Sequence, residues 1–127
     1  MIRRPPRSTL DRSSAASDVY KRQVISFAEH NASYTSAFKN IFDWISRIDK
    51  NIWHNKPMFL LATSTGGNGA VIVLEAAFSR ISRRNTNHIS TFSLPNFNEN
   101  FNDRMGITNP KLKSSFELKL DEFISKI

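Results

Sequence analysis

The chain has 127 residues, a length that suits one domain with a modest hydrophobic core, and its formal net charge is +7. It contains no cysteine, which excludes disulfide scaffolds, zinc–thiolate centres and cysteine nucleophiles. No apolar run approaches the length of a membrane span and the three histidines show no ligand spacing, so we expect neither a membrane partner nor a metal site.

The positive charge is concentrated near the N-terminus. Residues 1–23 contain six Lys or Arg and two Asp, whereas residues 24–127 contain 12 basic and nine acidic side chains. The near-equal numbers of basic and acidic side chains in residues 24–127 are ordinary for a domain surface. A nucleic-acid-binding role would therefore depend on the N-terminal segment, and we expect no nucleic-acid partner for the rest of the chain.

Residues 1–23 lack glycine, have few large apolar residues and show no periodicity, which predicts a disordered basic segment. Three interpretations compete for this segment: a transit peptide, which two aspartates and the Pro5-Pro6 pair disfavour, a nucleic-acid-binding arm, and non-native sequence. The third is favoured, because the string MIRRPPRSTLDRSSAASDVYKRQ resembles the translation of a sequencing adapter. We therefore expect the native domain to comprise residues 24–127.

The domain shows alternating strand and helix patterns in the order β-α-β-α-β-α. Short apolar runs predict strands at Val24–Phe27, Met58–Thr63 and His88–Leu94. Helix signals begin near Thr35, Gly69 and Asn109, and polar loops are expected over residues 28–34 and 98–106. This alternation predicts an α/β fold in which helices cover both faces of a parallel sheet.

The predicted helices carry apolar stripes that indicate their buried faces. The second helix is apolar on most sides, so we expect it to be largely buried. In the first and third helices the stripes repeat at helical spacing, and we expect these positions in the core: Ala37, Phe38, Ile41, Phe42, Ile45 and Ile48, then Leu112, Phe116, Leu120, Phe123 and Ile127.

A glycine-rich segment, Ser64 to Ala70, joins the central strand to the second helix. Its glycines allow a sharp turn and close approach to a ligand, and the helix offers free N–H groups and the positive end of its dipole. The glycine spacing fits neither a dinucleotide fingerprint nor a P-loop. Taken by itself, the segment is equally consistent with a tight turn that binds nothing.

Two segments together resemble the NADPH-dependent FMN reductase family. Residues 28–34 and the helix that follows, with its Lys39-Asn40 pair, are similar to the family's Pro-Glu-Tyr-Asn-x-Ser loop and Leu-Lys-Asn-x-x-Asp-Trp helix. Residues 64–70 are similar to its Ser-Pro-Gly-Gly-x-Gly-Gly/Ala loop. The resemblance implies a flavodoxin-like three-layer sandwich that binds FMN and is reduced by NADPH or NADH.

The same resemblance implies which residues contact the flavin, mostly through their backbone: Glu29, His30, Asn31, Ala32, Ser33, Ser64, Thr65, Gly66, Gly67, Asn68 and Gly69. Ala28, His30 and Thr65 stand where the family pattern has Pro, Tyr and Pro. No side chain stands out as a general acid or base. The hydride chemistry belongs to the cofactors, while the protein supplies position and electrostatics.

The family holds the FMN phosphate on a Gly-Ser-x-Arg-x-x-Ser-like loop between its first strand and first helix. The segment from Arg7 to Ser14 mimics the composition of that loop, but no strand pattern precedes it. The resemblance therefore implies an N-terminally truncated domain that contains strands 3–5 and their helices. Because strand 3 would then be an unpaired sheet edge and the phosphate loop would be missing, we expect this chain expressed by itself to be poorly soluble, colourless and inactive.

The leading functional hypothesis concerns the parent protein, of which this chain is expected to be a part. It is a cytoplasmic oxidoreductase that passes a hydride from NAD(P)H to FMN and then to a small-molecule acceptor: a quinone, an azo compound or a flavin. Members of the resembled family are commonly dimers or tetramers, so a homo-oligomer is expected. The alternative is a flavodoxin-like binding or structural module without turnover. A third hypothesis, a small nucleic-acid-binding protein, depends only on net charge.

Overall fold

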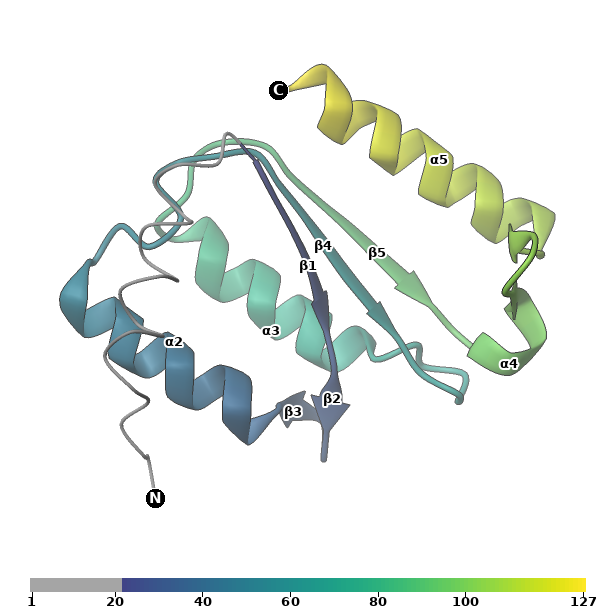
Figure 1. The fold of residues 1–127 in the computed structure, drawn as a ribbon, viewed down its shortest axis with the longest axis horizontal. Coiled ribbons are helices and arrows are strands. Elements are labelled where there is room, and N and C mark those ends of the chain that lie inside the picture. The colour runs from purple at the N-terminus through teal and green to yellow at the C-terminus, as the bar shows by residue number, and fades with distance from the viewer. Residues whose placement is uncertain (1–21) are drawn as a thin grey trace.

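The computed structural model describes residues 22–127, which form a parallel sheet between two layers of helices (Figure 1). The sheet consists of β1 (Gln23–Phe27), β4 (Met58–Thr63) and β5 (Ile89–Leu94), in the order β1-β4-β5. The predicted α/β class with a parallel sheet is confirmed. Of the segment 1–23, residues 1–21 lie outside the described part, so its predicted disorder and non-native origin stay predictions.

The central strand β4 holds the sheet together because it is paired and covered on both sides. It pairs in parallel with β1 and with β5, so that Leu60 lies opposite Ile25 on one side and Thr91 on the other. Met58, Phe59 and Leu60 are at most 1% exposed. A continuous apolar run is what a parallel strand buried on both faces requires, and this explains the predicted sequence pattern.

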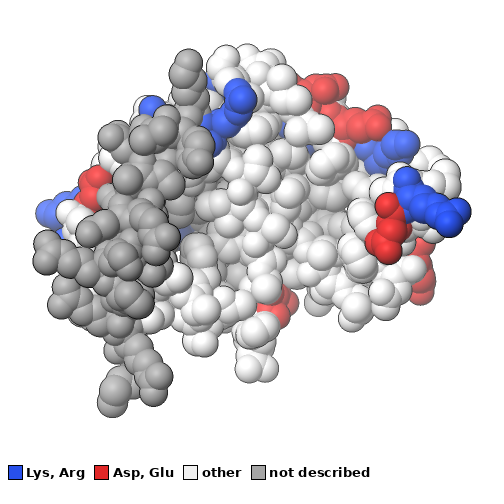
Figure 2. All heavy atoms as spheres, in the orientation of Figure 1, with Lys and Arg blue, Asp and Glu red and all other residues white. Residues whose placement is uncertain are grey.

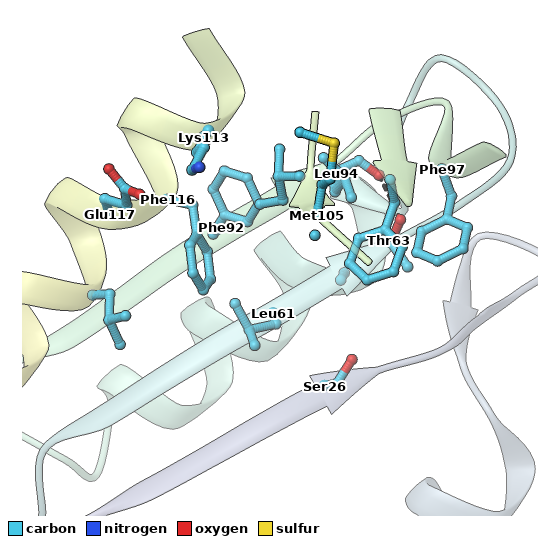
Figure 3. Close-up of a pocket in the computed structure, with 15 residues that line it drawn as sticks. Ser26, Leu61, Thr63, Phe92, Leu94, Phe97, Met105, Lys113, Phe116 and Glu117 are labelled. Atoms are coloured by element: carbon cyan, nitrogen blue, oxygen red, sulfur yellow. Dashed lines mark hydrogen bonds between the residues drawn. The ribbon is translucent and has the colours of Figure 1, made fainter. Parts of the chain in front are cut away.

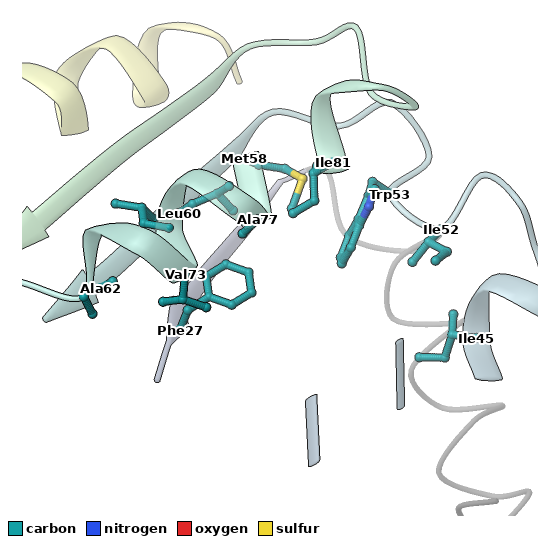
Figure 4. Packing of buried hydrophobic residues seen from close by; sticks show 12 residues of the cluster. Phe27, Ile45, Ile52, Trp53, Met58, Leu60, Ala62, Val73, Ala77 and Ile81 are labelled. Atoms are coloured by element: carbon teal, nitrogen blue, oxygen red, sulfur yellow. The ribbon is translucent and has the colours of Figure 1, made fainter. Parts of the chain in front are cut away.

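One face of the sheet packs against α2 (Ser36–Ile48) and α3 (Val71–Ser82). Figure 4 shows Leu60 and Ala62 of β4 facing Val73 and Ala77 of α3 in this core. Phe27 of β1 joins the same cluster, as do three residues of α2 and the loop that follows it: Ile45, Ile52 and Trp53.

The other face packs against a single helix, α5 (Pro110–Ser125). Asn109 caps its first turn, since the side-chain oxygen accepts hydrogen bonds from the amides of Lys111 and Leu112, as the Asn-Pro pair predicts. Phe59 contacts Phe116 and Phe123 with ring centroids 5.8 Å apart in both pairs. Aromatic packing therefore holds α5 on β4.

Both predicted polar loops contain regular structure. The first is a hairpin of β2 (Glu29–His30) and β3 (Ser33–Tyr34). Asn31 and Ala32 form its two-residue turn with φ of 52° and 60°, as in the turns that match strand twist. The second contains a short helix, α4 (Phe97–Asn100), and a hairpin of β6 (Phe101–Asn102) and β7 (Gly106–Ile107).

Several apolar positions predicted to be buried are exposed. Ile48 is 55% exposed and Ala37 is also exposed, because α2 ends at Ile48 and presents only its Phe38–Ile45 side to the core. Ile127 is 47% exposed since α5 ends two residues earlier. The prediction that the second helix is largely buried is wrong as well: α3 packs on one side only, which leaves Ile72 and Phe78 exposed.

Charged side chains of both signs lie toward the periphery of the face seen in Figure 2, while uncharged residues occupy its middle. Helix α5 (Pro110–Ser125) carries both basic and acidic residues, among them Lys113, Glu117 and Lys119. Within residues 22–127, no helix combines the length and apolarity needed to cross a bilayer.

Candidate functional site

The two predicted site segments lie next to each other at the carboxyl edge of the sheet. β1 and β4 are neighbouring parallel strands, and Phe27 at the end of β1 lies opposite Ala62 near the end of β4. The hairpin at residues 29–34 follows β1, and the glycine-rich loop at residues 64–69 follows β4. Parallel pairing therefore brings together two segments that are separated by the whole of α2. This edge is where open α/β sheets bind ligands.

The hairpin after β1 is anchored at its base and open at its tip. At the base, Tyr34 lies 6.2 Å from Phe27 and 5.2 Å from Phe38, measured between ring centroids. The tip residues from His30 to Ser33 are exposed. Their side chains and backbone are therefore accessible to a ligand at the sheet edge.

Glu29 points away from the hairpin tip and toward α3. Its Oε2 atom accepts a hydrogen bond of 2.8 Å from the amide of Val73, in the first turn of that helix. The residue before α3, Ala70, has no side-chain oxygen to cap the helix and makes no side-chain cap. A carboxylate from a distant part of the chain thus satisfies one of the amides that every helix N-terminus leaves unpaired.

The glycine-rich loop is held by the exit of the third strand, β5. The backbone amides of Asn96 and Phe97 donate to the carbonyls of Gly66 and Ser64 at 2.9 and 3.0 Å. The Ser93 hydroxyl donates to the carbonyl of Gly69 at 2.7 Å. These bonds fix the loop on the side that faces β5 and leave its other side open.

The glycines of this loop differ in what they require. Gly69 is buried with φ of 59°, and a Cβ atom there would lie 2.3 Å from the Ser93 hydroxyl and 2.9 Å from the Pro95 nitrogen. Gly66 and Gly67 are exposed, and a Cβ atom at either would meet nothing within 4 Å. The absence of a side chain is therefore needed for folding at Gly69, whereas Gly66 and Gly67 keep open space above the loop.

Four consecutive amides in the loop are available to a ligand. Thr65, Gly66, Gly67 and Asn68 are exposed, and none of their backbone N–H groups donates a hydrogen bond to another part of residues 22–127. Backbone donors on an open loop at a strand end suit a ligand with a flat apolar body and a polar edge.

A cavity of about 480 Å³ lies on the face of the sheet that α5 covers. Figure 3 shows Phe92 and Phe116 between the sheet and α5, with Lys113 and Glu117 on α5 near them. The cavity lining is almost wholly apolar and includes none of the predicted site residues. It is thus a feature of the α5 face, and it adjoins the glycine-rich loop at Thr63 and at Phe97, whose amide donates to the Ser64 carbonyl.

Sequence reasoning missed the residues that hold the site from behind. Ser93 lies in the predicted strand His88–Leu94, Asn96 and Phe97 follow that strand, and the sequence predicts no site role for any of the three. The one signal for their role is topological, since a strand parallel to β4 must end beside the loop that follows β4. The amide of Val73, which pairs with Glu29, has no sequence signal at all.

Residues 8–99 match the family model described as NADPH-dependent FMN reductase. The chain belongs to the NADPH-dependent FMN reductase family. The matched region contains both loops and begins within the segment predicted to be non-native. Membership makes the chain an NAD(P)H-dependent flavin oxidoreductase by family, with FMN as cofactor and NAD(P)H as electron donor.

Among solved structures, the chain is similar to FerB, a flavoenzyme NAD(P)H:(acceptor) oxidoreductase from Paracoccus denitrificans. The TM-score is 0.72 at 21% sequence identity, and the alignment covers 94% of this chain and 67% of FerB. At this identity the likeness shows the fold, and it confirms the flavodoxin-like prediction. No curated protein matches the sequence.

The loops of this FMN reductase domain fit the isoalloxazine ring of FMN. The ring is flat and largely apolar with a polar edge, and the loop offers exposed amides from Thr65 to Asn68 with no Cβ atom at Gly66 or Gly67. The sequence of residues 22–127 contains no Gly-Ser-x-Arg-x-x-Ser-like loop to hold the phosphate. The fit therefore concerns the ring portion of the cofactor.

We expect Gly69→Ala to destabilise the fold by about 2–4 kcal/mol, because the substitution combines left-handed backbone strain with a clash against Ser93 and Pro95. Gly67→Ala is the matched control and should change the free energy of unfolding by at most about 0.5 kcal/mol. Urea unfolding of both variants measures the difference. Equal stability of the two variants would contradict the packing role of Gly69.

Tyr34 should make unfolding depend on pH in the alkaline range. Burial raises the pKa of the Tyr34 phenol above its ordinary value, and the nearby positive charge of Arg80 lowers it in part. Above about pH 10 the unfolded chain loses this proton while the folded protein keeps it, so the free energy of unfolding falls until the pH passes the folded-state pKa.

Tyr34→Phe removes the titrating group while keeping the ring. The variant should therefore lose less stability than the wild type when urea unfolding is compared at about pH 8 and about pH 11. Identical losses in the two proteins would show that the Tyr34 phenol is equally easy to ionise in the folded and unfolded states.

Proposed function

We propose that this protein is an FMN-dependent NAD(P)H oxidoreductase that reduces a small-molecule acceptor, namely a quinone, an azo compound or a free flavin. Family membership supports the use of FMN and NAD(P)H. The observation that carries the proposal is the pair of adjacent loops at the sheet edge. One of them offers four amides that donate to nothing within residues 22–127, beside two glycines with open space above them.

The overall reaction transfers two electrons. NAD(P)H gives up a hydride and becomes NAD(P)⁺, and the acceptor gains two electrons and two protons, the second proton coming from solvent. FMN, when bound, supplies the hydride-carrying chemistry between donor and acceptor. The residues of this chain are left with binding, orientation and electrostatic stabilisation.

Among the residues predicted to contact the flavin, in segments 29–33 and 64–69, we assign the ring contacts to those that are exposed. The amides from Thr65 to Asn68 would donate to the polar edge of the ring and stabilise negative charge that builds up there on reduction. The hairpin tip from His30 to Ser33 would cover an adjoining part of the ring. Ser64, half-buried at the loop base, joins the contacts, whereas Glu29 and Gly69 support the site from behind.

The alternative is a flavodoxin-like module that binds without turnover. It is favoured by the substitutions Ala28, His30 and Thr65, of which the first and third remove prolines that would stiffen the loops. Turnover separates the two functions when the flavin concentration exceeds its Kd. NADPH oxidation that depends on added FMN supports the oxidoreductase, while flavin binding without oxidation supports the module. A cytoplasmic location is part of the oxidoreductase proposal, because the cytoplasm supplies NAD(P)H.

Flavin binding is the direct test of the proposed ring site. If flavin is held by the ring loops of residues 22–127, which include no phosphate loop, FMN and riboflavin should bind with Kd values within about threefold of each other. Gly67→Ala should weaken both by about tenfold, because the added methyl group occupies the space through which the ring edge approaches. Quenching of flavin fluorescence measures all four affinities.

Gly67→Ala is the informative variant for binding, because it fills the open space above the loop and is expected to leave the fold unchanged. Gly69→Ala is expected to destabilise the fold itself. Unaltered riboflavin affinity in a folded Gly67→Ala variant would show that the ring does not approach this loop. If the wild-type chain quenched the fluorescence of neither flavin, the proposed ring site would be wrong.

We also propose that the protein assembles as a homo-oligomer, either a dimer or a tetramer. The segment from Phe38 to Trp53 is rich in apolar residues, and Ile48 within it is 55% exposed. Light scattering of the purified protein should show a mass of at least two chains, and Ile48→Lys should shift the distribution toward monomer. A wild-type protein that stays monomeric at all concentrations would contradict the proposal.

A further inference from the structure

We propose that Glu29 is a positioning residue that sets the distance between the two flavin loops before any ligand binds. The inference rests on the proposed function, since it concerns the same site. It starts from one contact: the hydrogen bond of 2.8 Å between the Glu29 carboxylate and the Val73 amide, which joins residues 44 positions apart.

This contact links the hairpin to the helix that follows the glycine-rich loop. Glu29 is the first residue of the hairpin, and Val73 lies in the first turn of the helix that follows the glycine-rich loop. The aromatic contacts of Tyr34 hold the other strand of the hairpin against β1 and α2. With both hairpin strands held, the orientation of the tip from His30 to Ser33 relative to β1, α2 and α3 is fixed.

The position of the carboxylate is unusual for a helix cap. In α2 and α5 the cap is local, since Thr35 accepts from the amide of Phe38 and Asn109 from that of Leu112. In α3 the local position is Ala70, whose methyl group cannot accept a hydrogen bond. The chain thus replaces a local cap with a remote one, and the remote cap ties the hairpin to the helix.

The charge of Glu29 is balanced by the helix and not by a basic side chain. Within residues 22–127, neither the Lys39–Asp43 ion pair nor the His54–Asp49 contact includes Glu29. A carboxylate at the start of α3 offsets the positive end of the helix dipole. The start of α3 is therefore already occupied by an anion.

Fixing the hairpin in advance should increase flavin affinity without adding a contact to the ligand. A hairpin that moves freely must be ordered on binding, and the measured Kd equals the intrinsic Kd divided by the fraction of time that the binding conformation is populated. Because the effect concerns ring loops, it should be the same for FMN and for riboflavin, which lacks the phosphate.

Three variants test this role. Glu29→Ala removes the acceptor, Glu29→Gln keeps an acceptor oxygen without the charge, and Asn109→Ala removes a helix cap of similar kind on the other side of the sheet. Two quantities are measured for each: the Kd for FMN and riboflavin by fluorescence quenching, and the hydrogen-exchange rate of the Val73 amide by NMR in the absence of flavin.

We expect Glu29→Ala to weaken the binding of both flavins by about tenfold and to speed exchange at Val73 by at least about tenfold. Glu29→Gln should restore affinity to within about threefold of wild type, and Asn109→Ala should leave affinity unchanged. If Glu29→Ala and Asn109→Ala lost the same amount of flavin affinity, the role of Glu29 would be one of general stability and the inference would be overturned.

Two further outcomes separate this inference from the proposed function. Tighter FMN binding in Glu29→Ala, with riboflavin unaffected, would show that Glu29 acts by repelling phosphate and does not position the loops. If the wild type bound no flavin, the proposed function would fail. The exchange rate at Val73 would then still decide whether Glu29 fixes the hairpin on α3, and unchanged exchange in Glu29→Ala would overturn the positioning role.

Discussion

The parallel register of β1 on β4 is the constraint on which the rest of the structure depends. Phe27 lies opposite Ala62, so both strands end at the same level and their loops leave the sheet side by side. A shift of this register by one residue would turn Phe27 away from the α3 core and move the hairpin relative to the glycine-rich loop. Burial of Phe27 against Val73 and Ala77 thus fixes the geometry of the candidate site as well as the stability of the sheet.

The site is built in two layers that have different chemical demands. The supporting layer consists of groups whose hydrogen bonds are already made within the protein. The Gly69 carbonyl accepts from the Ser93 hydroxyl, and the Ser64 and Gly66 carbonyls accept from the backbone amides that follow β5. The Glu29 carboxylate accepts from the Val73 amide. The outer layer consists of exposed amides and a hairpin tip whose hydrogen-bonding groups remain available. This division is what a preorganised binding site requires, because a ligand then meets fixed donors and does not have to order them.

The strands and the helix starts could be predicted from local patterns. The apolar run Met58–Thr63 specified a buried strand, and Asn109-Pro110 specified a helix start, since each depends on residues close in sequence. The Asn31–Ala32 turn was missed because its positive φ angles occur without glycine. Neither the Glu29–Val73 cap nor the hydrogen bonds from Asn96 and Phe97 to the glycine-rich loop could be predicted, because they join segments that only the fold brings together. Ile48 matched the helical period of the core but lies at the helix end, where nothing within residues 22–127 covers it.

Hydrogen exchange with and without saturating riboflavin, resolved by peptide along the full chain, tests the central claim most directly. Two accessible places compete for a flat apolar ligand: the pair of loops at the sheet edge and the apolar cavity beneath α5. The account predicts that riboflavin slows exchange in peptides covering residues 28–34 and 64–70 and leaves residues 112–120 unchanged. Protection of residues 112–120 without protection of the two loops would place the ligand under α5 and contradict the account.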